Sequence, residues 1–139
     1  MAFAVEDCKK TFGVAKSRGC EVVKEPFTIE DKDGGIITQA TIKTYGETTL
    51  TFIQRDNFNG FFLPGYIAKK EDPMQTLVEQ PTFGFIDHIV GNHKVGDMEP
   101  TVQWFEKILD FHRFWSIDDS VIHTEYRYLD IFLIFFEIF

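Results

Sequence analysis

Histidine is the side chain of this sequence best suited to chemistry, and all four histidines lie in the second half of the chain. A neutral imidazole can bind a metal ion, and it can exchange protons near neutral pH. His88 stands out because it lies within an apolar run at residues 83–92, where a polar ring needs a partner. The commoner interpretation of such a residue is a half-buried ring that hydrogen-bonds a backbone carbonyl, and metal ligation is the alternative.

The run around His88 has the composition of a β-strand. It is rich in β-branched and aromatic residues and ends in Gly-Asn, which is typical of a turn. Side chains of a strand alternate between its faces, so Ile86, His88 and Val90 would share one face while Asp87 lies on the other. A metal ligand at His88 would therefore point to the concave side of its sheet, and Asp87 would be a poor ligand.

The other histidines are weaker candidates for metal binding. His93 lies in a predicted loop flanked by glycines, where a solvated ring is the simpler interpretation. His112 follows a predicted helix, whose last carbonyls its ring could meet. His123 begins a predicted strand, and Glu125 is the carboxylate beside it that could complete a ligand set.

The elements that must position these side chains begin with a predicted strand at residues 1–6 and a helix. Asp7 is a plausible N-cap of this helix and Gly19 suits its C-cap. Cys8, Phe12 and Ala15 recur at helical spacing and form its predicted buried face. Three strands follow, at residues 20–23, 36–45 and 48–54, with turns at residues 31–35 and at Gly46.

A second unit begins in the same way after residue 83. The strand that carries His88 is followed by a helix that Pro100 opens, and strands are predicted at residues 112–115 and 122–126. The residues expected on the buried side of this helix are Val102, Phe105, Ile108 and Leu109. Two units that begin alike predict an α+β fold built from repeated βαβββ modules, of which the second is incomplete.

Composition divides the chain into four predicted parts. Residues 1–56 form the first module, residues 57–82 are a connection rich in proline and glycine, and residues 83–126 start a second domain. We expect the first module and the second domain to be separate packed units. Residues 127–139 form an apolar tail that is too short to span a membrane. This tail is either a buried strand or an extension foreign to the rest of the protein, and we favour the extension.

Charge and cysteine content restrict the function. The sequence has 22 acidic and 14 basic side chains and a net charge of −8, which opposes binding to nucleic acid and to anionic membranes. Cys8 and Cys20 form no CxxC pair, so they predict reduced, buried thiols in an intracellular protein. The start of the chain shows no secretory signal, and we expect a cytoplasmic protein.

Several segments together resemble the 4-hydroxyphenylpyruvate dioxygenase family, and the resemblance extends over about residues 2–126. The longest are residues 85–92 (Phe-Ile-Asp-His-Ile-Val-Gly-Asn), 104–119 and 121–126. Shorter ones are residues 5–8 (Val-Glu-Asp-Cys), 45–49 (Tyr-Gly-Glu-Thr-Thr) and 62–66 (Phe-Leu-Pro-Gly-Tyr). The resemblance implies βαβββ modules of the vicinal-oxygen-chelate type. The first module here would then be the second βαβββ module of the family's amino-terminal domain, and residue 83 would start its catalytic, iron-binding domain.

The resemblance also implies a chemistry. In this family His88 would be the first of three protein ligands to Fe(II), and a second histidine and a glutamate would come from a later module. The substrates would be 4-hydroxyphenylpyruvate and O2, the product would be homogentisate in tyrosine and phenylalanine catabolism, and the full-length protein would be a homo-oligomer. The family pattern places no ligand at Glu125, and His123 does not match its ligand spacing.

Two functions remain open. The first is a 4-hydroxyphenylpyruvate dioxygenase of which this chain is a part, and the chain alone is then expected to be inactive because it supplies one ligand. The second is a non-catalytic protein of the same βαβββ superfamily that keeps the fold for binding or assembly.

Overall fold

The computed structural model describes residues 1–68, 73, 77, 84–86, 89–91, 93–94 and 96–117, with the backbone of three short strands beyond. The first elements are β1 (Ala2–Ala4), α1 (Cys8–Ser17), β2 (Val22–Glu30), β3 (Ile36–Lys43) and β4 (Thr49–Asp56). The later elements are α2 (Met98–Leu109), β5 (His112–Ile117), β6 (His123–Thr124), β7 (Arg127–Tyr128) and β8 (Ile131–Phe135).

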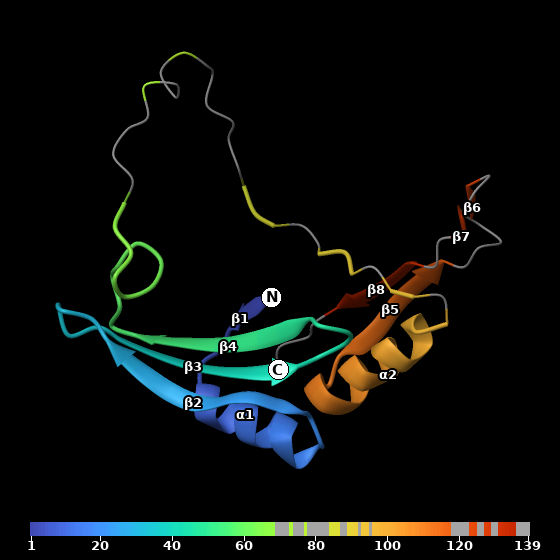
Figure 1. Ribbon diagram of the computed structural model, residues 1–139, viewed down its shortest axis with the longest axis horizontal. Helices are drawn as coiled ribbons and strands as arrows, with labels where there is room; N and C mark the ends of the chain where they lie inside the picture. The colour runs from blue at the N-terminus through green and yellow to red at the C-terminus, as the bar shows by residue number, and fades with distance from the viewer. Residues whose placement is uncertain are drawn as a thin grey trace.

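The first five elements form one βαβββ module, which confirms the predicted α+β class. Its sheet has the strand order β1-β4-β3-β2, with β1 parallel to β4 and the two hairpins antiparallel. Helix α1 lies on one face of this sheet (Figure 1). The connection from β1 through α1 therefore carries the chain from one edge of the sheet to the other.

Helix α1 begins and ends where its capping residues predict. The Asp7 carboxylate accepts a hydrogen bond of 2.8 Å from the backbone N–H of Lys10, which satisfies one of the unpaired donors of the first turn. Gly19 follows the last turn with φ +95°, a left-handed conformation that other residues adopt only with strain. Cys8, Phe12 and Ala15 are buried, as their spacing predicts.

Strand β2 is longer than the predicted strand at residues 20–23. Lys24, Glu25 and Pro26 interrupt its apolar pattern, and proline cannot donate to a neighbouring strand. These residues are tolerated because β2 is an edge strand whose register with β3 shifts between Val22 and Phe27. The predicted turns are confirmed: Asp31 and Gly35 close the β2–β3 hairpin through a 2.8 Å hydrogen bond, and Gly46 has φ +51°.

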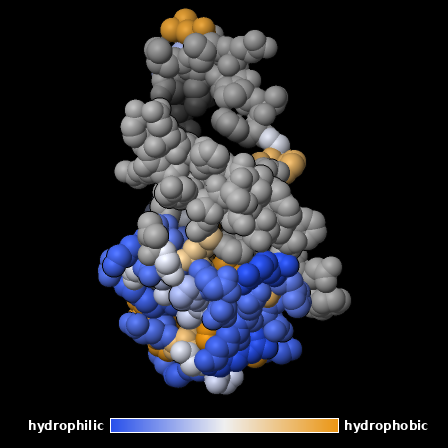
Figure 2. Space-filling model, turned by 90° about the vertical axis from the view of Figure 1, so that its right-hand side faces the viewer, coloured by the Kyte–Doolittle hydropathy of each residue, from blue (hydrophilic) through white to orange (hydrophobic). Residues whose placement is uncertain are grey.

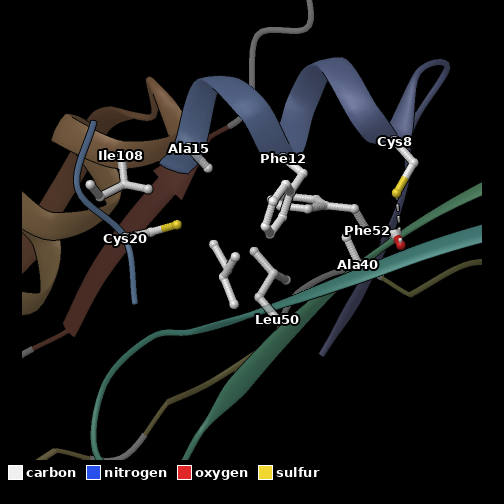
Figure 3. Packing of buried hydrophobic residues seen from close by; sticks show 9 residues of the cluster. Cys8, Phe12, Ala15, Cys20, Ala40, Leu50, Phe52 and Ile108 are labelled. Carbon is white, nitrogen blue, oxygen red and sulfur yellow. Dashed lines mark hydrogen bonds between the residues drawn. The ribbon is translucent and has the colours of Figure 1, made fainter. Parts of the chain in front are cut away.

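The hydrophobic core lies between α1 and the central strands β3 and β4 (Figure 3). Phe12 meets Phe52 there, and the Cys8 thiol donates to the Phe52 carbonyl over 3.7 Å. Ile108 joins this core from α2, far along the chain. The cluster consists of Cys8, Phe12, Ala15, Cys20, Ala40, Ile42, Leu50, Phe52 and Ile108. Most described atoms on the face shown in Figure 2 are hydrophilic, as expected outside such a core.

The second helix does not belong to a separately packed unit, so that expectation is wrong. Helix α2 ends beside α1, where Arg18 donates to the Ile108 carbonyl over 3.3 Å and lies 3.4 Å from the Asp110 carboxylate. Phe111 follows α2, and the centroid of its ring lies 6.2 Å from that of Phe3 in β1. The apolar face of α2 packs on this surface, and its residue Ile108 is only 2% exposed there. Removal of this apolar side chain from water stabilises the contact. The proposed domain boundaries themselves stay a prediction.

Two details of the second unit also differ from the sequence prediction. Helix α2 begins at Met98 rather than Pro100, although Val102, Phe105 and Ile108 are buried as expected. The described residues 84–86 and 89–91 belong to no strand, so the predicted strand at residues 83–92 is wrong there. A strand is stable only when its backbone groups pair with a neighbour, and no described strand pairs with these residues.

Strand β8 lies within the apolar tail and pairs antiparallel with β5, between His112–Phe135 and Ile117–Ile131. Residues 131–135 therefore form a strand, whereas the burial of this strand and the foreign origin favoured for the tail stay predictions. Strands β6 and β7 form a separate short hairpin between them. Among the described residues, no helix is long and apolar enough to cross a membrane.

We predict that Leu50→Ala destabilises the chain by about 2–5 kcal/mol, because Leu50 is fully buried between α1 and the sheet and its loss leaves a cavity. Leu77→Ala is the matched control, since Leu77 is 75% exposed. Urea unfolding followed by circular dichroism measures both variants. Equal midpoints for the two variants would contradict the observed core.

Candidate functional site

The predicted iron ligand His88 and its neighbour Asp87 lie outside the residues that the structure describes. The expected direction of the His88 ring therefore stays a prediction. Its closest described companions on the predicted face, Ile86 and Val90, are 81% and 71% exposed. These two side chains are therefore exposed, and the concave face predicted for His88 stays a prediction.

His93 is not the solvated loop histidine that the sequence indicated. Its ring is half-buried, and its centroid lies 4.1 Å from that of Tyr45 at an interplanar angle of 54°. Its Nδ1 lies 3.4 Å from the Thr101 hydroxyl, a long contact whose donor depends on the imidazole tautomer. The sequence could not show this, because Tyr45 and His93 are joined only by the tertiary fold.

The Tyr45–His93 pair lies at a groove between the first module and α2. The volume of this groove is about 380 Å³. One wall is the β3–β4 turn at residues 44–46, and the other is the start of α2. The lining residues outside the turn are His93, Lys94, Asp97, Pro100, Thr101 and Trp104. The groove combines aromatic surface with one ammonium and one carboxylate group.

Of the remaining histidines, only His112 has a described side chain, and it does not line this groove. His112 is exposed and begins β5 just after Asp110, whose left-handed φ of +63° ends α2. His123 begins β6, where its backbone pairs with Tyr128, and its side chain lies outside the description. Glu125 also lies outside the described residues.

The described residues include histidine, cysteine, aspartate and glutamate, the side chains that could hold a metal ion. Within them, no three side chains of the histidine, cysteine, aspartate or glutamate type lie close enough together to hold a metal ion. A facial site for Fe(II) needs two histidines and one carboxylate. The described part of the chain therefore does not by itself fit this metal.

The cysteines are buried free thiols, as predicted. Burial raises the pKa of the Cys8 thiol, and the Asp7 carboxylate raises it further against a smaller opposite effect of Lys9. Burial also raises the pKa of Cys20, opposed by a backbone hydrogen bond and by Lys16. Only the thiolate is a strong nucleophile, so both residues are placed for packing rather than for reaction.

The arrangement β1-α1-β2-β3-β4 is a module of the vicinal-oxygen-chelate fold. The chain is similar in structure to a triple mutant of 4-hydroxymandelate synthase from Streptomyces coelicolor, with a TM-score of 0.67 and 20% sequence identity. The similarity covers 96% of this chain and 36% of that protein. At this identity the comparison establishes the fold alone.

By sequence, the chain is a homologue of 4-hydroxyphenylpyruvate dioxygenases. It is 49% identical to the enzyme of that name from Dictyostelium discoideum over 131 residues, which is 93% of this chain and 35% of that protein. Identity is 45% with the Tetrahymena thermophila protein and 47% with the Xenopus tropicalis protein, each over 93% of this chain. The chain thus spans about a third of the length of these relatives. No protein-family model matches it.

The buried thiols predict a loss of stability at alkaline pH. A raised pKa means that the folded state holds the thiol proton more tightly than the unfolded chain does. The protonated thiols therefore contribute to the free energy of unfolding below the pKa of the unfolded chain. This contribution is lost as pH rises through the pKa of the folded state. We expect the urea midpoint to be unaffected by this contribution below the usual cysteine pKa of about 8.5, and to fall as pH rises from there through the raised pKa of the folded state. The Cys8→Ala/Cys20→Ala double variant should show a smaller fall, and an equal fall would contradict the assignment.

Proposed function

We propose that this chain is part of an Fe(II)-dependent 4-hydroxyphenylpyruvate dioxygenase, which converts 4-hydroxyphenylpyruvate and O2 to homogentisate. The observation that supports this proposal is the 43–49% identity to proteins of that name across 93% of the chain. Similarity at this level extends through both the βαβββ module and the residues around α2. The names of the homologues support the oxidoreductase class, and the metal, the substrate and the pathway are the finer parts of the proposal.

Within this proposal His88 is the residue of the chain that binds iron. The support is its position in the segment Asp-His-Ile-Val, which matches the family's ligand-bearing segment residue by residue. When bound, iron would supply a centre at which a 2-oxo acid and O2 meet. The other two ligands would come from a module that this chain does not contain, so the chain alone is proposed to be inactive.

The described residues have a supporting part in this proposal. The βαβββ module provides a packed base against which α2 docks, and α2 follows the His88 segment directly in the chain. Precise placement of a metal ligand requires elements whose own packing is fixed. We further propose that the whole protein works in the cytoplasm as a homo-oligomer, without nucleic acid or membrane partners.

The second candidate is a non-catalytic binding or assembly protein of the same superfamily. The described residues do not distinguish it from the first candidate, because both candidates leave these residues without a three-ligand metal cluster. This candidate predicts that His88 can be replaced without loss of any activity. The two candidates can therefore be distinguished by replacing His88 in a protein that also contains the later module.

We predict that residues 2–126 of this chain, replacing the matching segment of the Dictyostelium discoideum enzyme, give a chimera that forms homogentisate. His88→Ala should lower this turnover by orders of magnitude, because loss of a metal ligand impairs the whole site. His112→Ala is the matched control and should leave turnover unchanged, since His112 is exposed on β5. Chromatography of homogentisate, with Fe(II) and ascorbate supplied, measures the rates.

Two outcomes would contradict the proposal. A folded chimera without turnover would favour the non-catalytic candidate. A His88→Ala chimera as active as the parent would remove His88 from the metal site. The 139-residue chain alone should form no homogentisate, and His88-dependent turnover by it would reveal a ligand set within the chain or across an oligomer.

A further inference from the structure

Among the described residues, Tyr45 of the first module contacts the segment that carries His88, through Gly91 and His93. Its ring lies 4.1 Å from the His93 ring and 6.2 Å from the ring of Phe105 in α2. Tilted aromatic pairs at such distances contribute about 0.5–1.5 kcal/mol beyond the burial of their surface. Tyr45 thus bridges two parts of the chain that are almost fifty residues apart in sequence.

Gly91 makes room for this contact. A Cβ atom added to Gly91 would lie 3.1 Å from Tyr45 Cζ and 3.2 Å from His93 Nε2, and closest of all to Tyr45 Oη. Such contacts are tighter than real Cβ atoms ordinarily make, so either the tyrosine or the segment would have to move. Glycine at this position therefore allows the backbone to pass directly against the phenol group.

Tyr45 itself is held by its hairpin. The Thr48 N–H donates to the Tyr45 carbonyl over 2.9 Å, and the Thr44 N–H donates to the Thr48 carbonyl over 3.0 Å. The Thr44 hydroxyl donates to the same Thr48 carbonyl over 2.9 Å. The tyrosine therefore projects from a turn whose backbone is fixed by three hydrogen bonds.

The opposite side of His93 meets α2. Thr101, whose hydroxyl lies 3.4 Å from His93 Nδ1, also donates to the Asp97 carbonyl over 2.8 Å. His93 is thus enclosed between the hairpin of the first module and the first turns of α2. The surrounding described residues 85, 86, 89 and 90 are exposed by 60–85%. Among the described residues of this segment, Gly91 and His93 are therefore the first that contact the packed first module, through Tyr45.

We propose that Tyr45 is a positioning residue that fixes Gly91 and His93, and through them the backbone that carries His88. His88 precedes Gly91 by three residues, so holding Gly91 limits where His88 can lie. The consequence for iron binding rests on the proposed function above, whereas the docking of Gly91 and His93 on Tyr45 does not.

The docking is tested in the chain itself by NMR of the histidine rings. A ring above the face of tyrosine has its carbon-bound protons shifted upfield, so we expect the His93 signals upfield of those in an unfolded peptide. Tyr45→Leu should abolish this shift and Tyr45→Phe should retain it. Tyr66→Leu is the matched control, because Tyr66 contacts Phe62 instead. An unchanged His93 shift in Tyr45→Leu overturns the proposal.

A second variant covers the case in which Tyr45→Leu disturbs the hairpin. Gly91→Ala leaves every residue of the first module unchanged and introduces a Cβ against Tyr45. It should also remove the upfield shift of His93, with the signals of the buried Leu50 methyl groups unaltered. Retention of the shift in Gly91→Ala would show that the segment does not rest on Tyr45.

The positioning role is tested in the chimera described above. Tyr45→Leu should lower kcat by on the order of tenfold, as is common for residues that orient a metal ligand, and Tyr45→Phe should restore it. Normal kcat in Tyr45→Leu with the His93 shift lost would overturn the positioning of His88. A chimera without any turnover refutes the proposed function instead, and the NMR comparison still decides the docking.

Discussion

The burial of one helix face against two central strands is the interaction on which the rest of this structure depends. Cys8, Phe12 and Ala15 on α1 meet Leu50 and Phe52 on β4, and each large side chain removed from water contributes roughly 1.5–3 kcal/mol. This core fixes the position of α1, and it fixes the β3–β4 hairpin at the same time. Both surfaces that receive α2 and the His93 segment, namely the end of α1 and the turn at residues 44–46, are parts of that arrangement.

The sequence predicted this first module well because its signals are local. The Asp7 cap, the spacing of Cys8, Phe12 and Ala15, and the glycines of the turns each act within a few residues. The strands alternate clearly where one face is buried, as in β3 and β4. Strand β2 was predicted too short because an edge strand tolerates charge and proline, which removes the pattern that identifies it.

The second part of the chain was predicted less well, because its structure depends on partners distant in sequence. An apolar run such as residues 85–90 has strand composition, but composition cannot supply the neighbour with which a strand pairs. The docking of α2 was missed for a similar reason. Its amphipathic pattern shows that a face is buried, but it does not show that Ile108 meets Cys20 or that Arg18 reaches the end of the helix. The resemblance identified His88 as a candidate ligand, yet it gave no information on what holds its backbone.

These observations separate the chemistry of the proposed site from its placement. Ligand identity is readable from a short motif, because a metal needs particular donor atoms. Placement depends on packing. Ile86 and Val90, the described residues on either side of His88, are exposed, so their side chains do not hold the His88 segment in place. The nearest described contacts that can do so are those of Gly91 and His93 with Tyr45, and Tyr45 belongs to the module that contains no part of the ligand motif. Under the proposed function, the βαβββ module would thus contribute to the placement of a metal ligand without providing a ligand itself.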